Sequence, residues 1–354
     1  MAETVLMKGN EALAEAAILA GCRHYFGYPI TPQTEIGAYL AKRMPQVGGV
    51  FLQAESEIAA IHMVYGASCA GKRAMTSSSS PGISLKSEGL SYLAGSDLPA
   101  FVVNVQRAGP GLGGIQPAQA DYFQATRGGG HGDFRNIVLA PASVQEMADL
   151  TIRGFELADR YSMTAMILSD GTIGQMMEQV VLESATPTEY EKPWALTGTR
   201  CEREKNVITS LYLAPAELEQ KNLSRFERYQ IVQRVEATHE AYCMEDADIC
   251  VVAYGISARV SKNAVAAARA KGIRAGLIRP ITLWPFPTEA LKQAAGSVKH
   301  FLSVEMSMGQ MIQDIELAIR CTRPVSLVSR VGGIIPTPEQ VLLAIEHANK
   351  GEAV

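Results

Sequence analysis

The sequence predicts an α/β protein with doubly wound parallel sheets, covered by helices on both faces. Apolar segments of about 4 to 7 residues alternate with helix-like segments of about 10 to 16 residues, the pattern of parallel βαβ units. The chain has 354 residues, of which 47% are hydrophobic and 31 are glycine. This length and composition predict two domains with sizeable cores and tight turns.

The first half of the chain shows the clearest alternation. Helices are expected over residues 11–21, 34–44, 56–71, 83–96 and 144–161. Strands are expected over residues 22–26, 49–55, 72–80, 98–107, 134–143 and 163–171. Because a helix separates most successive strands, the strands are expected to run parallel.

Residues 186–245 interrupt this alternation. Their first part is polar and contains two prolines, and residues 214–240 have the pattern of one long charged helix. We interpret this stretch as a connector or arm, with its charges on a solvated face. The alternation resumes near residue 246. The predicted organisation is therefore a first domain at 1–190, an arm at 191–245 and a smaller α/β domain at 246–354.

Charge and cysteine usage exclude several classes of function. The net charge is −4 and no basic cluster is present, which argues against nucleic acid and anionic membrane surfaces as partners. No apolar run approaches the roughly 20 residues of a membrane span, and the start lacks signal-peptide features, so a cytoplasmic location is expected. The six cysteines form no CxxC pair. We therefore expect no metal site within this chain.

Unusual residues follow four predicted strands of the first domain. They are the stretch GYPITPQTE at 27–35, the acid pair Glu55 and Glu57, the stretch TSSSSPG at 76–82, and Arg107 followed by AGPGLGG. In open parallel sheets, ligands bind beyond the carboxyl ends of the strands. The sequence therefore predicts that these groups converge on one binding edge.

The turn after the first of these strands contains Pro29 and Pro32 with Thr31 between them. Proline fixes φ and keeps the preceding residue out of the helical region. The turn is therefore stiff and extended, with a hydroxyl at its apex.

Each candidate side chain also has a structural interpretation. Arg107 suits a bidentate grip on a carboxylate or phosphate, and it could equally be a salt-bridge partner. Glu57 is either a catalytic carboxylate or a partner of the helix dipole. The hydroxyls of Ser77–Ser80 could simply satisfy backbone groups in a loop. His131 is as suited to a structural hydrogen bond as to catalysis, and His62 is expected to pack.

The glycines at 109, 111 and 114 form a literal G-x-G-x-x-G after a strand. This pattern could mark a dinucleotide site. However, the loop opens onto IQPAQADYFQ and not onto a clear apolar helix, and it follows a later strand of the domain. We therefore favour a flexible loop that approaches an active site closely.

Taken together, these stretches resemble the α (pyrimidine-domain) subunit of 2-oxoacid:ferredoxin oxidoreductases. The matching segments are MKGNEA, GYPITPQTE, QAESEIAAI, TSSSSPGISLK, VNVQRAGPGLG, HGDF and LAPASVQE in the first domain, and RPITLWPFP and VEMSMGQM in the second. The resemblance covers the chain apart from the arm near 195–235. It implies a thiamine-diphosphate pyrimidine-type domain followed by a transketolase C-terminal-like domain.

Within this family, the run RAGPGLGGIQPAQADYFQATRGGGHGDF is similar to the 3-methyl-2-oxobutanoate (ketoisovalerate) branch. Subunits of the 2-oxoglutarate branch tend to have a serine-threonine form of the glycine loop and a threonine where Gln116 stands here. The resemblance therefore implies oxidative decarboxylation of a branched-chain 2-oxoacid to an acyl-CoA, CO2 and reduced ferredoxin. The same chemistry on 2-oxoglutarate, pyruvate or an aryl pyruvate is the alternative.

The resemblance also implies roles for individual residues. Glu57 would hydrogen-bond the aminopyrimidine ring of thiamine diphosphate and assist removal of the reactive proton. Thr31, Arg107 and Gln116 would face the substrate, with Arg107 pairing with its carboxylate. The remaining cofactor contacts would come from Tyr28, Pro29, Ile30 and Ser79.

Partner chains are implied by what the chain does not contain. Thiamine enzymes bind the diphosphate through Mg²⁺ with a GDG motif and a later asparagine. The most similar piece here is Ser169–Gly171, and the next asparagine is Asn206. The family supplies the metal from a β subunit, and the [4Fe-4S] clusters from γ or ferredoxin-like δ chains. We expect half an active site in a hetero-oligomer of dimerised αβ units that uses CoA and ferredoxin.

Two readings from other classes remain. The chain could be a non-catalytic scaffold that only positions a β partner and clusters, or a stand-alone NAD-dependent dehydrogenase based on GPGLGG. A scaffold would have no need of Glu57, Thr31 and Arg107 on one edge. The dehydrogenase reading requires tight NAD binding by the isolated chain, which we expect to be absent.

Overall fold

The computed structural model describes residues 3–183 and 186–352. A seven-stranded sheet forms the first unit, in the order β12-β6-β7-β5-β4-β2-β3. Its parallel strands are β2 (His24–Gly27), β3 (Val50–Gln53), β4 (Ala74–Ser78), β5 (Ala100–Gln106), β6 (Ile137–Leu139) and β7 (Thr164–Asp170). The prediction of a parallel α/β sheet is therefore confirmed.

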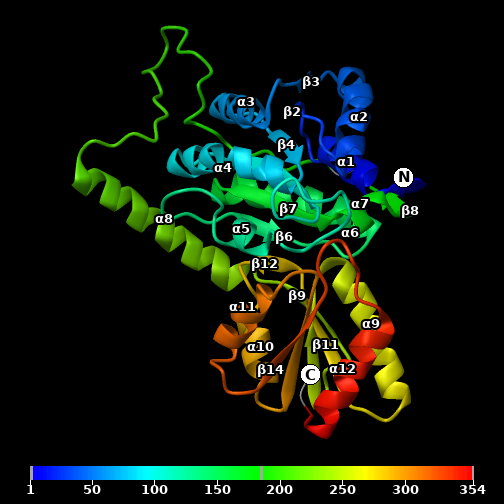
Figure 1. The fold of residues 1–354 in the computed structure, drawn as a ribbon. Coiled ribbons are helices and arrows are strands. Elements are labelled where there is room, and N and C mark those ends of the chain that lie inside the picture. Colours follow the sequence, from blue (N-terminus) through cyan, green and yellow to red (C-terminus); the bar gives the residue numbers. More distant parts are fainter. Residues whose placement is uncertain (1–2, 184–185, 353–354) are drawn as a thin grey trace.

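Helices cover this sheet on both faces (Figure 1). Right-handed crossovers place α3 (Glu57–Cys69), α4 (Ser80–Gly95) and the short α5 (Tyr122–Thr126) on one face. The opposite face carries α1 (Gly9–Leu19), α2 (Thr34–Arg43) and α6 (Val144–Tyr161). Strands β4, β5 and β7 are buried along their whole length, which explains their apolar runs.

Two strands that the sequence analysis missed form a separate antiparallel ribbon. Strand β1 (Glu3–Lys8) pairs with β8 (Met177–Leu182), and the short helix α7 (Gly171–Gln175) precedes β8. About 170 residues separate the two strands in the chain. Because their pairing is non-local, neither segment shows the βαβ rhythm that revealed the other strands.

A five-stranded sheet forms the second unit, in the order β14-β13-β10-β11-β9. Its strands are β9 (His239–Tyr242), β10 (Ile249–Val252), β11 (Ala275–Pro280), β13 (His300–Glu305) and β14 (Val325–Ser329), of which β9 is antiparallel. The helices of this unit are α9 (Gly255–Ala270), α10 (Thr288–Ala294), α11 (Met311–Ala318) and α12 (Pro338–Lys350).

The chain exchanges strands between the two units. Strand β9 lies within the stretch expected to be an arm, yet it pairs with β11 of the second sheet. Strand β12 (Thr282–Trp284) comes from the second half of the chain and pairs antiparallel with β6 of the first sheet. The two sheets are therefore linked through main-chain pairing as well as through side chains.

Helix α8 (Pro215–Val235) runs along one side of the molecule toward the second unit (Figure 1). Its buried residues are Arg225, Tyr229 and Val232, one narrow face of the helix. Arg225 pairs with Asp97, which follows α4, and donates to the carbonyl of Gly95. Helix α8 is thus tied to the C-terminal end of α4 in the first unit by charged hydrogen bonds. Among the described residues, no helix is both long and apolar enough to cross a membrane.

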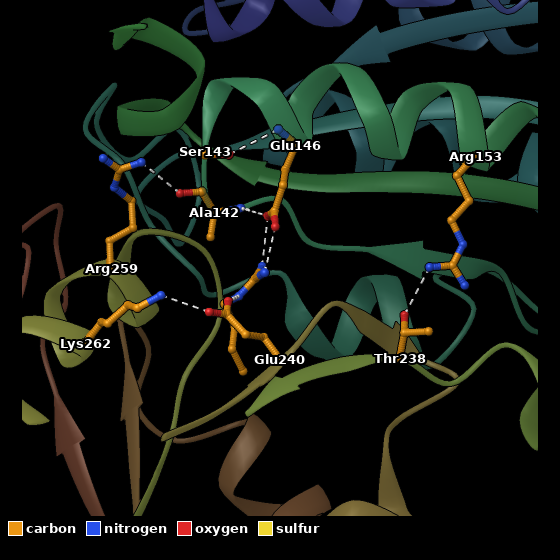
Figure 2. A network of polar contacts seen from close by, with 9 residues as sticks. Ala142, Ser143, Glu146, Arg153, Thr238, Glu240, Arg259 and Lys262 are labelled. Carbon is orange, nitrogen blue, oxygen red and sulfur yellow. Dashed lines mark hydrogen bonds and ion pairs between the residues drawn. The ribbon is translucent and has the colours of Figure 1, made fainter. Parts of the chain in front are cut away.

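An ion network joins the two units (Figure 2). Arg279 on β11 is 5% exposed and donates two hydrogen bonds to Glu146 of α6, at 2.9 and 2.6 Å. The same guanidinium donates to Glu240 of β9 at 2.8 Å. Arg259 of α9 donates to the carbonyl of Ala142, just before α6, at 3.1 Å. Arg279 therefore clamps a helix of the first unit onto the second sheet.

The Arg279→Met variant tests this clamp. Removing the guanidinium leaves Glu146 and Glu240 close together without their shared cation, so we expect the free energy of unfolding in urea to fall by roughly 1–3 kcal/mol. Arg274→Met is the control, because Arg274 pairs with Asp248 at the surface and should barely move the urea midpoint. Equal midpoints for the two variants would contradict a clamp at Arg279.

Candidate active site

Side chains after four adjacent strands, in the order β5-β4-β2-β3, meet at one edge of the first sheet. Arg107 directly follows β5 and Ser79 follows β4, while Thr31 lies in the turn after β2 and Glu57 begins α3 after β3. The Nη1 atom of Arg107 donates to the carbonyl oxygen of Thr31 at 3.1 Å. The turn and the arginine that the sequence singled out are thus in direct contact.

Hydrogen bonds from buried polar side chains fix the main chain of the proline turn. Gln33 is buried, and its Nε2 donates to the carbonyl of Tyr28 at 3.2 Å. Its Oε1 accepts from Ser77 Oγ of β4 at 2.5 Å. The carbonyl of Pro32 accepts from Asn10 Nδ2 of α1 at 2.8 Å. These bonds fix both ends of the turn and leave Thr31 exposed at its apex.

The main chain of Arg107 is fixed by a second polar network. Ser80 Oγ accepts from the amide of Arg107 at 3.0 Å and donates to Asp121 at 2.6 Å. Asp121 also accepts from Asn104 Nδ2 of β5 at 2.9 Å. Burial raises the pKa of Asp121, and the hydrogen bonds from Ser80 and Asn104 oppose that rise. The start of α4 and the end of β5 are therefore held together.

The guanidinium of Arg107 is buried, yet its hydrogen bonds are incomplete. Its two terminal nitrogens donate to the carbonyls of Thr31 and Leu112, at 3.1 Å each. Its Nε atom is buried and has no partner among the described residues. No carboxylate in the described part of the chain forms a salt bridge with it. The salt-bridge interpretation of Arg107 is thus not what the structure shows, and the cation is free to receive an anion.

Glu57 is a buried residue whose carboxylate has no hydrogen-bond partner in the described chain. It is 6% exposed, and within the described ranges no donor bonds its side-chain oxygens. Ser56 caps α3 instead, accepting from the amide of Ala59 at 3.2 Å. The neighbouring hydroxyl of Ser78 is fully enclosed without a partner in the described chain, and so is the hydroxyl of Ser79 at the end of the same strand. This cluster of unsatisfied polar groups is what an absent polar ligand would leave behind.

Gly82 is required for the close approach of α4 to this cluster. A Cβ at Gly82 would collide with Ser78 Oγ and lie 2.7 Å from Glu57 Oε1. The glycine therefore lets the carboxylate and the hydroxyl lie against the helix backbone.

Lys86 is a site residue that the sequence analysis missed. It is fully buried on α4, one turn beyond Gly82, and its Nζ donates to the carbonyl of Glu57 at 3.4 Å. Burial lowers the pKa of Lys86 to about 8, and the charge of Glu57 opposes that shift. The sequence does contain a pattern that could have pointed to Lys86. Gly82, Lys86 and Gly89 are spaced so that they lie on one face of a helix.

The other residues that the sequence analysis assigned to the site lie on the proline turn and on the glycine loop. Tyr28 and Pro29 are exposed, Ile30 is half-buried, and Gln116 is exposed on the glycine loop. A Cβ at Gly333 of the second unit would collide with the side chain of Gln116, so the two loops touch.

The two histidines lie outside this cluster. His62 was expected to pack, but it is exposed, and its ring bonds the carbonyl of Ile58. His131 is exposed, and its ring lies edge-on to Tyr92. Neither histidine forms a hydrogen bond to Thr31 or Glu57.

The glycine loop and the Ser-Asp-Gly piece have structural explanations. Residues 109–114 lead to an irregular segment, and α5 begins only at Tyr122, so the strand–turn–helix unit of a dinucleotide site is absent from this loop. Asp170 is buried and accepts from the amides of Thr172, Ile173 and Ile256. Burial raises its pKa to about 6. Asp170 thus holds α7 and the second unit in place.

A Gly82→Ala substitution tests the packing around Glu57. The added methyl group has no room against Ser78 and Glu57, so we expect the free energy of unfolding to fall by about 1–3 kcal/mol. Gly66→Ala is the matched control, because a Cβ at this exposed position of α3 meets nothing within 4 Å. It should raise stability by roughly 0.5–1 kcal/mol. A Gly82→Ala protein as stable as the parent would contradict the packing.

The pKa of Lys86 predicts a pH-dependent contribution to stability. Its folded pKa, about 8, lies below the ordinary value of 10.5, so the unfolded state binds more protons between these pH values. Stability therefore rises with pH across that window, by up to about 3 kcal/mol relative to Lys86→Met. Urea titrations from pH 7 to 11 measure the difference. A constant difference between the two proteins would show that Lys86 has an ordinary pKa.

Comparison with known proteins identifies the family of the chain. Residues 15–242 match the family model described as pyruvate flavodoxin/ferredoxin oxidoreductase, thiamine diphosphate-binding, and residues 247–341 match pyruvate:ferredoxin oxidoreductase core domain II. The ketoisovalerate oxidoreductase subunit VorB of Methanothermobacter marburgensis is 54% identical over 97% of both chains. The 2-oxoglutarate synthase subunit KorA of Archaeoglobus fulgidus is 38% identical over 97% of this chain and 99% of that one.

Solved structures agree as well. The 2-oxoglutarate:ferredoxin oxidoreductase from Magnetococcus marinus superposes with a TM-score of 0.87 at 29% identity, covering 98% of this chain and 65% of that one. A split-gene transketolase shares the fold, with a TM-score of 0.59 at 14% identity. The family models together span most of the chain, and its curated relatives match it nearly end to end. This chain therefore belongs to the 2-oxoacid:ferredoxin oxidoreductase family, as one of its subunits.

Proposed function

We propose that this chain provides half of an active site that oxidatively decarboxylates 3-methyl-2-oxobutanoate (ketoisovalerate) to an acyl-CoA, CO2 and reduced ferredoxin. The observation that supports it most directly is the carboxylate of Glu57, which belongs to a buried residue, has no hydrogen bond in the described chain and lies beside the enclosed, unpartnered hydroxyl of Ser78. An enclosed polar group of this kind is costly unless a ligand bonds to it.

The residues present fit the aminopyrimidine ring of thiamine diphosphate. A ring nitrogen carrying a proton would donate to Glu57, and the Ser79 hydroxyl would satisfy a polar edge of the ring. The main chain of Tyr28, Pro29 and Ile30 would line the site above the turn. When bound, thiamine diphosphate supplies a carbon nucleophile for the 2-oxo group and a sink for the electrons left by CO2. The task of Glu57 is to hold the proton at the ring nitrogen.

Arg107 and Thr31 would position the substrate. The free donors of the Arg107 guanidinium suit the carboxylate of a 2-oxoacid, and the surrounding hydrogen bonds keep its main chain from shifting. Thr31 offers a hydroxyl on a turn fixed at both ends. Gln116 lies on the loop that follows Arg107 and would help close the site. Such preorganisation lowers the entropic cost of reaching a reactive geometry.

The substrate assignment draws on two observations. Identity to a ketoisovalerate oxidoreductase subunit is 54%, against 38% to a 2-oxoglutarate synthase subunit. The glycine loop also exposes apolar side chains, with Leu112 83% and Ile115 60% exposed. The carbonyl of Leu112 accepts from Arg107. An apolar loop beside the proposed carboxylate site suits a branched aliphatic tail better than a second carboxylate.

Partner chains would complete the site. Apolar side chains are exposed around the same edge, including Tyr28, Leu52, Ile58 and Leu85, and exposed apolar groups in one region favour a protein interface. A β subunit would hold the diphosphate with Mg²⁺, and γ or δ chains would carry the [4Fe-4S] clusters that pass electrons to ferredoxin. Dimerised αβ units and a cytoplasmic location remain part of this proposal.

The test is CoA-dependent reduction of a viologen dye by the complex purified through this chain. We expect higher kcat/KM with 3-methyl-2-oxobutanoate than with 2-oxoglutarate or pyruvate. A preference for either of those acids would retain the chemistry and refute the substrate assignment. A complex that binds thiamine diphosphate and clusters but oxidises no 2-oxoacid would refute the reaction and favour a scaffold role.

Single substitutions separate the proposed roles. Glu57→Gln should lower kcat by about 10²–10⁴-fold, because the amide cannot hold the proton that a carboxylate shares with the ring. Arg107→Met should raise KM by roughly 10–100-fold through loss of a charge-assisted hydrogen bond. Glu55→Gln, an exposed neighbour of Glu57, is the control and should match the parent. Equal effects of Glu55→Gln and Glu57→Gln would contradict the role of Glu57.

A further inference from the structure

The stretch VEMSMGQM at residues 304–311 contains the turn from β13 to α11 in the second unit. The carboxylate of Glu305, a residue that is 1% exposed, organises this turn. It accepts hydrogen bonds of 2.7 to 2.9 Å from two hydroxyls and three main-chain amides, those of Ser303 and Ser307 and of Gln310, Met311 and Ile312. Because so many donors share one buried carboxylate, the main chain of the turn is fixed.

The turn holds the start of the segment 119–123, which leads into α5 of the first unit. The amide of Met306 donates to Gln119 Oε1, and the carbonyl of Met306 accepts from the amide of Gln119, at 3.1 Å each. Gln119 is itself buried. The segment therefore begins at a point that the second unit fixes.

The side chain of Gln310 holds the rest of this segment. Its Nε2 donates to the carbonyl of Ala120 at 2.7 Å, and its Oε1 accepts from the amide of Phe123 at 2.8 Å. Both ends of the side-chain amide are thus bonded to main-chain groups of the first unit. Asp121 lies between these two contacts, so Gln310 fixes the main chain on either side of it.

Asp121 in turn determines which way the hydroxyl of Ser80 points. Ser80 Oγ lies 2.6 Å from Asp121 Oδ2 and 3.2 Å from the carbonyl oxygen of Arg107, and the hydroxyl has one proton for these two acceptors. The shorter contact, to a carboxylate, is the stronger one. With its proton on Asp121, the hydroxyl presents a lone pair to the amide of Arg107, which donates at 3.0 Å. A displaced Asp121 would therefore loosen the main chain of Arg107.

We propose that Gln310 is a positioning residue that holds Asp121 and, through Ser80, fixes the main chain from which the Arg107 guanidinium would reach the carboxylate of the substrate. Gln310 itself would touch neither the substrate nor thiamine diphosphate. The hydrogen-bonded path concerns this chain alone, and its consequence for a 2-oxoacid rests on the proposed function. The second unit, to which Gln310 belongs, would thereby influence the affinity for the 2-oxoacid from outside the site.

Hydrogen–deuterium exchange of the purified complex tests the path without a catalytic readout. Gln310→Met removes both contacts of the side chain, and Gln313→Met, at an exposed glutamine of α11, is the matched control. In Gln310→Met the amide of Arg107 should exchange at least about 3-fold faster, because its acceptor is held less firmly, whereas the control should match the parent. Faster exchange at Phe123 with an unchanged Arg107 amide would overturn the proposal, because the effect would then end at the segment.

Steady-state kinetics of the same variants test the consequence for the site, with the 2-oxoacid that the complex oxidises best. In Gln310→Met the KM for this acid should rise by roughly 3–30-fold, because a misplaced cation binds the carboxylate less well. The KM for CoA and kcat should stay near the parent values. A purely structural defect would lower the active fraction, and therefore kcat, at an unchanged KM. That result would overturn the positioning role.

Ser80→Ala tests the middle of the path and applies even if Gln310→Met does not fold. It removes the hydroxyl between Asp121 and Arg107 and leaves Gln310 in place. The KM for the 2-oxoacid should therefore rise as it does in Gln310→Met. A parental KM in Ser80→Ala would overturn the proposal, because the hydroxyl would then not be what holds Arg107.

A double variant tests whether Gln310 acts through Arg107. Added to Arg107→Met, the Gln310→Met change should raise KM little further, because a residue that acts through the guanidinium has no effect once that group is gone. A KM equal to the product of the two single effects would overturn the proposal. A parental KM in Arg107→Met alone would instead refute the substrate role that the proposed function gives Arg107, and the exchange of its amide would still decide the path.

Discussion

The close approach of helices α3 and α4 at Glu57 is the constraint on which the candidate site depends. The carboxyl end of β3 delivers Glu57 to the start of α3, Ser56 takes over the capping of that helix, and Gly82 lets α4 approach until the carboxylate touches its backbone. Hydroxyls from the end of β4 face the same place. None of these features would be needed for a stable sheet alone. They fit the proposal that the aminopyrimidine ring of thiamine diphosphate binds at this edge.

The second unit holds the irregular loop that follows Arg107 and contacts it directly at Gln116. Gln119 is the connecting residue: it is buried, its Nε2 donates to the carbonyl of Tyr254 at 2.8 Å, and its Oε1 accepts from Ser257 and from the amide of Met306. Gln119 lies near the end of the irregular loop that runs from Arg107 to the start of α5. The second sheet thereby fixes the far end of the loop, and the Arg279 clamp keeps that sheet in register with α6.

Charged groups at the binding edge of the first sheet lack hydrogen-bond partners in the described chain. Arg107 has spare donors, Glu57 lacks a donor, and apolar side chains surround both. A charged centre with an apolar rim is what a partner chain would cover while excluding water, and exclusion of water strengthens every electrostatic interaction inside. Family membership as a subunit agrees with this picture. In the proposed function, this chain would provide a rigid half of the active site, and the surface of another chain would complete it.

The sequence by itself determined the parallel sheets, the order of their helices and the edge at which Thr31, Glu57 and Arg107 gather, because strand–helix alternation and proline chemistry are local properties. It could not reveal the β1–β8 ribbon or the exchange of β9 and β12 between the sheets, since those pairings join segments far apart in the chain. Nor could it show that the Glu57 side chain lies in the first turn of α3 without a hydrogen bond to the described residues, or that Lys86 is buried beside it. Only the tertiary structure decided these features, because burial and the choice of hydrogen-bond partners are properties of packing and not of residue order.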